Sequence, residues 1–149
     1  MKRGEIEAAV KELAAATAKL PMDADAFLLL GQGEDRLGHV TRAEAAWKSA
    51  VKLVPTFAEA RYRLGRLQMD RGQASAALPN LRVAAEHVAS GGANDGTWRV
   101  DLYFQLGFAE TRQGSRDRAL AAFRRYLEVA PGDAPARVEV TRQIHEIVP

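Results

Sequence analysis

A short set of residues recurs along this sequence at a nearly fixed distance, and this recurrence limits the possible folds more than any other feature. Leu30-Gly31 returns 34 residues later as Leu64-Gly65 and again 42 residues later as Leu106-Gly107. Each copy is followed by a second glycine, an alanine and a large apolar residue, which are Gly38, Ala43 and Trp47, then Gly72, Ala77 and Leu81, then Gly114, Ala119 and Phe123. A period in this range is typical of a stacked repeat array.

The segments between these marks favour helix. Ala, Leu, Glu, Arg and Gln dominate long windows, and no segment alternates β-branched and polar residues at a period of two. Proline and glycine set the expected ends. We therefore predict helices over residues 5–20, 24–37, 41–54, 58–71, 75–89, 98–113, 117–130 and 133–147.

Several predicted helices begin with residues suited to capping. Asp23 is the expected N-cap of the second helix, and Gly38 is expected to end it in the left-handed conformation. Thr41 with Glu44, and Thr56 with Glu59, have the spacing of capping boxes, while Ser75 is expected to cap the helix from 75. Pro79 is then predicted in the first turn of that helix, where a missing backbone donor costs little.

These residues resemble the tetratricopeptide repeat, a pattern of 34 positions with Leu-Gly, small and aromatic residues, and a closing proline such as Pro55 or Pro131. The resemblance implies an all-α fold, a right-handed superhelical stack of about eight helices in antiparallel pairs. It covers one domain, residues 1–149. Its parts are a half-repeat helix (5–20), repeats at 24–55, 58–89 and 98–131, an insertion at 90–97 and a capping helix (133–148).

Packing explains the spacing. Gly31, Gly65 and Gly107 are expected where the two helices of a pair cross most closely, with Ala43, Ala77 and Ala119 opposite them. Trp47, Leu81 and Phe123 are expected to fill the space between one pair and the next. In the last helix, Val138, Ile144 and Ile147 are predicted to pack inward, while Arg137, Glu139, Arg142 and Glu146 face water.

The sequence departs from the family pattern at three positions. The first aromatic position holds Arg61 in the middle repeat, and the second aromatic position holds polar residues in every repeat, namely Glu34, Gln68 and Glu110. A position expected to be small holds Tyr126, which must push the last pair apart or lie over its edge.

The resemblance also implies a concave groove, lined by the first helices of the pairs, that binds peptides. Its residues by register are Leu28, Leu29, Gln32, Asp35 and Arg36; Tyr62, Arg63, Arg66, Met69 and Asp70; and Phe104, Gln105, Phe108 and Arg112. We expect Leu28, Tyr62, Met69, Phe104 and Phe108 to be exposed in this groove. The alternative is that Phe104 and Phe108 lie under the last helix and Leu28 under an upstream repeat.

The chemistry of these residues describes a partner. The Lys and Asn residues of the family's carboxylate clamp are missing, which argues against an adaptor for chaperone tails. The arginines could bind carboxylates, so we expect a protein or peptide with apolar and some acidic residues.

Other classes of protein are disfavoured. The net charge is only +2, without a clustered basic patch for nucleic acid, and no apolar run is long enough to span a membrane. There is no cysteine, and His39, His87 and His145 are scattered, so we expect no metal, cofactor or enzymatic activity. Without a secretory signal, the expectation is a cytoplasmic protein or a piece of a longer one, and the Arg- and Ala-rich usage suits a bacterium.

Two functions remain open. The chain is either a monomeric adaptor or scaffold that binds a partner segment, or a structural spacer that associates with itself through its end helices. The turn-rich stretch 90–97 is either a tolerated insertion or a flexible lip beside Trp98 that contacts a partner.

Overall fold

The computed structural model describes residues 2–89 and 96–148, and eight α-helices lie within them. Their bounds are α1 (Arg3–Lys19), α2 (Ala24–Arg36), α3 (Val40–Leu53), α4 (Ala58–Asp70), α5 (Ala74–Ala89), α6 (Trp98–Arg112), α7 (Arg116–Val129) and α8 (Ala136–Ile147). The described residues contain no strand, so the all-α prediction is confirmed. Most of the predicted insertion, residues 90–95, lies outside them.

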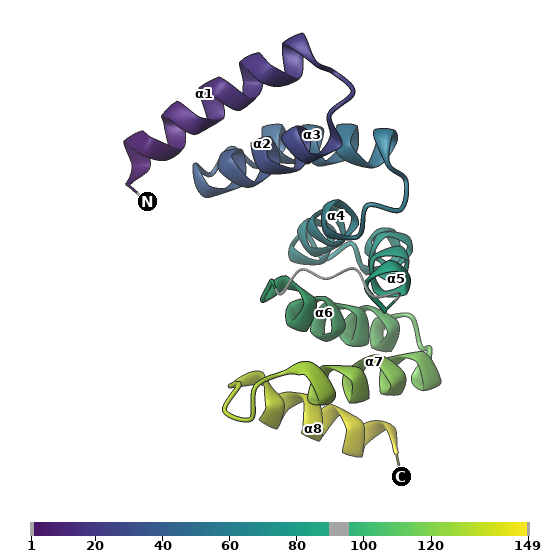
Figure 1. Cartoon of the computed structure of the whole chain (residues 1–149). Helices are drawn as coiled ribbons and strands as arrows, with labels where there is room; N and C mark the ends of the chain where they lie inside the picture. The colour runs from purple at the N-terminus through teal and green to yellow at the C-terminus, as the bar shows by residue number, and fades with distance from the viewer. Residues whose placement is uncertain (1, 90–95, 149) are drawn as a thin grey trace. The chain divides into compact units, whose positions relative to one another are not determined.

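Contacts divide the chain into two compact units, Met1–Leu64 and Gly65–Pro149, and α4 runs through the boundary. In the first unit, α1 and α3 both pack on α2 (Figure 1). In the second, α5, α6 and α7 each pack on the next helix in the chain (Figure 1). The assignment of the whole chain to one domain stays a prediction.

Gly31, Gly65 and Gly107 lie where the helices of a pair approach most closely, as predicted. A methyl group added at any of them would come within 3 Å of a side chain from the second helix of the same pair, far inside normal contact distance. The carbon of such a methyl group would lie 2.3 Å from the Trp47 ring at Gly31, 2.6 Å from Leu81 at Gly65 and 2.3 Å from the Phe123 ring at Gly107. These large residues therefore fill the space inside each pair. The sequence placed them between one pair and the next, and of the three, Phe123 shares a buried cluster with Val140 of α8.

The second unit has a core built on α6, α7 and α8. Tyr103, Ala119, Phe123, Tyr126, Ala130 and Val140 form this buried cluster. Tyr126, at a position expected to be small, is itself buried, so it neither lies over the edge nor is left exposed. Its ring occupies core volume next to the last helix.

The structure corrects the orientation of α8. Val138 was expected to pack inward but is 79% exposed, and Val140 is the fully buried residue. Ile144 and Ile147 do pack against the core, as predicted. The helix begins at Ala136 rather than at Asp133, and Arg137 does not simply face water, because its guanidinium donates to the carbonyls of Leu127 and Ala130 at 2.9 and 3.0 Å.

Helix starts are also partly different from the prediction. Asp23 does cap α2, since its Oδ1 accepts from the Ala26 N–H at 2.9 Å. However, α3, α4 and α5 begin at Val40, Ala58 and Ala74. Thr41 and Ser75 therefore lie inside helices, and Thr56 lies two residues before α4, one position too early for a cap. Pro79 is the sixth residue of α5, beyond its first turn.

The left-handed turns explain the starts of α3 and α5. Gly38, Gly72 and Gly114 have φ values of 82°, 73° and 78°, and each ends a helix as predicted for Gly38. The residue after each glycine already accepts the first helical hydrogen bond with its carbonyl, as His39 does from the Ala43 N–H at 3.0 Å. The next helix therefore starts directly after the turn, whichever side chains follow.

The three polar residues at the second aromatic position all have polar partners. Glu34 Oε2 lies 2.6 Å from His39 Nδ1, and Gln68 Oε1 accepts from Asn80 Nδ2 at 2.9 Å. The Glu110 carboxylate, only 2% exposed, accepts two hydrogen bonds from Arg82 at 2.7 and 2.8 Å. Paired in this way, polar groups replace aromatic rings without leaving buried charge unsatisfied.

The close approach at Gly31 gives a stability prediction. Gly31→Ala should lower the free energy of unfolding by about 1–3 kcal/mol, because the new methyl group overlaps the Trp47 ring. Gly4→Ala in α1 is the matched control, since nothing lies within 4 Å of that position, and it should not destabilise the chain. Urea unfolding followed by circular dichroism measures both. In a Trp47→Ala background the Gly31→Ala penalty should disappear; an equal penalty in both backgrounds would contradict the assignment.

The Arg82–Glu110 pair gives a second prediction. Arg82→Ala should destabilise the chain by about 1–3 kcal/mol, because the buried Glu110 carboxylate loses its donors. Arg142→Ala, which breaks an exposed pair with Glu139, should change stability little. Adding Glu110→Leu to Arg82→Ala should restore part of the lost free energy of unfolding, as measured by urea unfolding. If Arg82→Ala and Arg142→Ala behave alike, the buried pair has no special role.

Candidate partner-binding surfaces

In the first unit, most of the apolar residues predicted for the groove are not exposed. Leu28 is buried and Tyr62 is only 2% exposed, whereas Leu29 is 50% exposed. The reason is helical geometry: Leu28 lies three residues before Gly31, and Tyr62 three residues before Gly65, so each shares a face with the crossing. The expectation that Leu28 and Tyr62 are exposed is therefore wrong.

Two polar residues predicted for the groove in this unit, Gln32 and Arg63, bind the same carboxylate. The Gln32 side-chain amide donates to Glu59 Oε1 at 2.7 Å, and Arg63 pairs with the same oxygen at 2.9 Å. The Arg63 guanidinium carbon also lies 5.6 Å from the centre of the Tyr62 ring. Glu59 therefore offsets the charge of Arg63. Arg36 is exposed, and its role as a groove residue stays a prediction.

In the second unit, the predicted residues divide in the same way. Met69 is buried, four residues after Gly65, so its expected exposure is also wrong. The Arg66 side chain lies 4.0 Å from the Asp70 carboxylate, and Arg112 is exposed near the end of α6. Their part in binding is still a prediction.

Phe104 and Phe108 are half-buried and pack against the core of the second unit. Their ring centres are 4.7 Å apart, Phe104 lies 6.0 Å from Tyr126, and Phe108 meets Phe123 edge-on at 5.2 Å. The core they pack against also holds side chains of α8. Both sequence alternatives are thus partly right: these rings are neither fully exposed nor fully covered.

A pocket of about 310 Å³ opens beside Phe104. It is lined by Thr97, Val100, Asp101, Phe104, Tyr126, Pro131 and Ala136, from the start of α6, the end of α7 and the start of α8. Sequence reasoning placed only Phe104 at a binding site. The sequence signal that could have located the other lining residues was Tyr126, a large residue at a position expected to be small, because it changes the space between helices. The pocket is mainly apolar, with Asp101 as its charged lining residue.

The electrostatics around this pocket are mild. Burial raises the pKa of the Tyr126 hydroxyl, an effect that Arg137 opposes and Asp101 reinforces. Gln105, a predicted groove residue, donates to the Asp101 carboxylate at 3.3 Å. The pocket therefore presents a neutral phenol and one carboxylate to a ligand. On the outer face of α8, hydrogen bonds from Arg142 lower the pKa of the Glu139 carboxyl.

No metal or membrane chemistry is visible in the part of the chain that the structure describes. Among those residues, no three His, Asp or Glu side chains gather where they could hold a metal ion. Nor does any of the described helices have the length and apolar character needed to cross a membrane.

Comparisons with known proteins agree with the fold. Residues 28–93 and 101–133 match two family models, both described as tetratricopeptide repeat, and neither describes an enzyme. No curated protein sequence matches the chain.

Solved structures with this fold include two of MamA and one of YrrB. The crystal structure of MamA has a TM-score of 0.74 and 23% identity, over 97% of this chain and 77% of that one. A MamA structure from Desulfovibrio magneticus RS-1 gives 0.69 and 22%, over 97% and 75%. YrrB, described as a TPR protein with an unusual peptide-binding site, gives 0.71 and 20%, over 91% and 63%. The repeats, their crossing glycines and the matching family models show that this chain belongs to the tetratricopeptide repeat family.

Proposed function

We propose that this chain is an adaptor or scaffold module that binds a peptide or helical segment of a partner protein. The tetratricopeptide repeat is a protein-interaction fold, and a peptide-binding site is described for YrrB. The proposal rests on the pocket beside Phe104. Phe104 lies on α6, the first helix of the third repeat.

The pocket suits one large apolar side chain of the partner. Its volume of about 310 Å³ and its lining by Val100, Phe104, Tyr126 and Ala136 favour a Leu, Met or Phe. Burying such a side chain contributes about 1.5–3 kcal/mol, so neighbouring contacts must supply the rest of the affinity. Exposed arginines such as Arg36 and Arg112 support the acidic component expected of the partner, each within its own unit.

We also infer that the module is not an enzyme and needs no cofactor. His39 lies beside Glu34, and His87 and His145 lie on other helices, α5 and α8. No nucleophile and base are paired by the repeat pattern, which supports a role in binding alone.

A second candidate function rests on a different observation. Large apolar side chains are exposed at the outer helices of each unit: Leu20 and Met22 after α1 in the first, and Val138 on α8 in the second. Such residues favour a structural segment that associates with copies of itself or with further repeats.

Filling the pocket tests the binding function. Ala136→Trp should weaken the binding of peptides selected by the wild-type chain from a random library by at least about tenfold, because the indole occupies the pocket. His145→Trp is the control, since it places the same side chain at an exposed position of α8. Fluorescence anisotropy measures the dissociation constants. Equal affinities for the two variants and the wild type would refute binding at this pocket.

Mass in solution separates the two functions. An adaptor should sediment as a monomer of 16.2 kDa, whereas a self-associating segment should be larger at micromolar concentration. In the second case, Val138→Glu and Met22→Glu should return the mass to that of a monomer, since each places a charge on an exposed apolar residue. A monomeric wild type would contradict self-association.

A further inference from the structure

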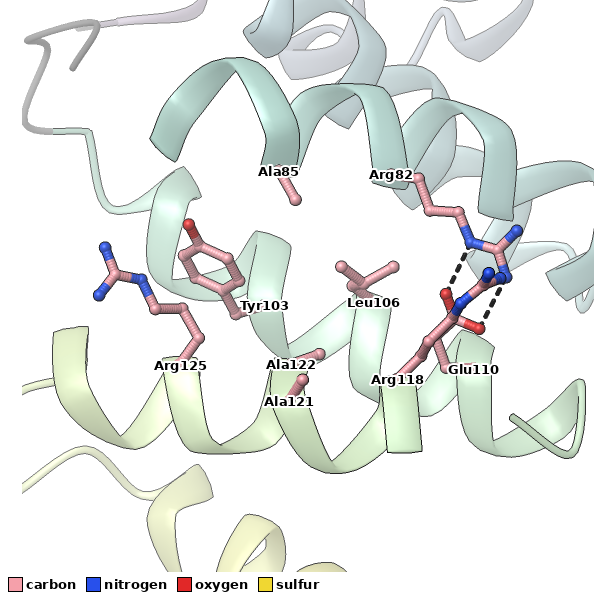
Figure 2. A pocket seen from close by; sticks show the side chains of 9 residues that line it. All are labelled: Arg82, Ala85, Tyr103, Leu106, Glu110, Arg118, Ala121, Ala122 and Arg125. Carbon is pink, nitrogen blue, oxygen red and sulfur yellow. Dashed lines mark hydrogen bonds and ion pairs between the residues drawn. The ribbon is translucent and has the colours of Figure 1, made fainter. Parts of the chain in front are cut away.

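A second pocket in the unit Gly65–Pro149 lies between α5 and α7, with α6 as its floor (Figure 2). Its volume is about 330 Å³. Small residues create it: Ala85 of α5 and Ala121 and Ala122 of α7 leave open space above Leu106. Four apolar side chains therefore surround a site that is large enough for one apolar side chain of a ligand.

This pocket is distinct from the one beside Phe104. Leu106 and Phe104 are two residues apart on α6, so they point about 160° away from each other around the helix axis. Glu110 and Tyr103, which also line the second pocket, lie on the Leu106 side of α6. A ligand bound here would therefore leave the Phe104 pocket open.

Arginines lie at both ends of the second pocket. Figure 2 shows Arg125 with Tyr103 at one end, and Arg82, Glu110 and Arg118 at the other. Three guanidinium groups thus line the pocket, with one carboxylate, Glu110, among its lining residues. The surface favours an acidic ligand.

The three arginines are not equally available. Arg82 is held by both Glu110 oxygens, and this hydrogen bonding raises the pKa of its guanidinium. Arg125 lies 5.8 Å from the centre of the Tyr103 ring and pairs with Glu128 at 2.6 Å, near the protein surface. Arg118 is exposed and has no ion-pair partner among the described residues. It is therefore the cation most open to a new carboxylate.

We propose that this pocket binds an acidic amphipathic helix of a partner protein. Arg118 and Arg125 are seven residues apart on α7, which places them two turns, or about 10 Å, from each other along one face. A helix lying along the groove can present carboxylates at the same two-turn spacing, one to each arginine. An apolar side chain between these carboxylates then enters the space left by the alanines. Glu110 offsets the charge of Arg82, so this end of the groove is held by a fixed ion pair and adds no net charge.

A designed peptide tests the proposal. The probe is a fluorescein-labelled, alanine-based helix of about 20 residues, with two Glu residues two turns apart and a Leu between them. A second peptide replaces both Glu residues with Gln. In anisotropy titrations with the full chain, the Glu peptide should bind at least about tenfold more tightly than the Gln peptide, and added salt should reduce this difference.

Matched variants locate the binding site. Arg118→Glu should weaken binding of the Glu peptide by at least about tenfold, because it reverses the most available charge. Arg124→Glu makes the same change on α7 outside the pocket lining and should have little effect. Ala121→Trp, at an exposed position, should block the pocket without changing charge, and Ala136→Trp should leave this peptide unaffected. Circular dichroism confirms that each variant is folded.

Three results would overturn the proposal. Equal binding of the Glu and Gln peptides would show that the arginines do not recognise carboxylates. Equal loss in Arg118→Glu and Arg124→Glu would show a general charge effect without a site. If Arg118→Glu instead lowers the mass of the free chain, the occupant is a second copy of the protein.

Discussion

The close crossing of paired helices is the constraint on which the structure depends. At Gly31, Gly65 and Gly107 the absence of a side chain lets a large residue of the second helix lie almost on the backbone of the first. This contact fixes how each pair packs, and it orients both helices about their own axes. Residues three or four positions from a crossing glycine lie on or beside the crossing face, and Glu34, Tyr103 and Glu110 are buried there.

Orientation set by the crossings decides which surfaces remain for binding. It buries Leu28, Tyr62 and Met69, and it leaves Phe104 half-buried at the margin of the core. The two pockets proposed for binding in the second unit therefore lie where neighbouring side chains fail to fill the space between helices. One lies beside Tyr126, where a large residue replaces a small one, and the other lies over three alanines.

The sequence was sufficient for the family, the helices and the crossing glycines, because each follows from the identity of residues at a fixed spacing. It was insufficient for helix starts and for exposure. Thr41 and Ser75 have the chemistry of caps, but the left-handed glycine turn before them sets the start on backbone geometry alone. The exposure of Val138 depends on how α8 packs on the core around Tyr126, with Val140 of α8 buried there instead, and no local pattern encodes that packing between distant segments. The two pockets were missed for the same reason.

The arginines around the second pocket differ in whether they pair with the buried carboxylate of Glu110. Arg82 is part of the folded scaffold, so evolution can alter it only together with the acid beneath it. Arg118 has no ion-pair partner among the described residues, so it can be substituted while the repeat stays folded. Among related chains, divergence in ligand preference should therefore accumulate at Arg118, while Arg82 and Glu110 change as a couple or remain as they are.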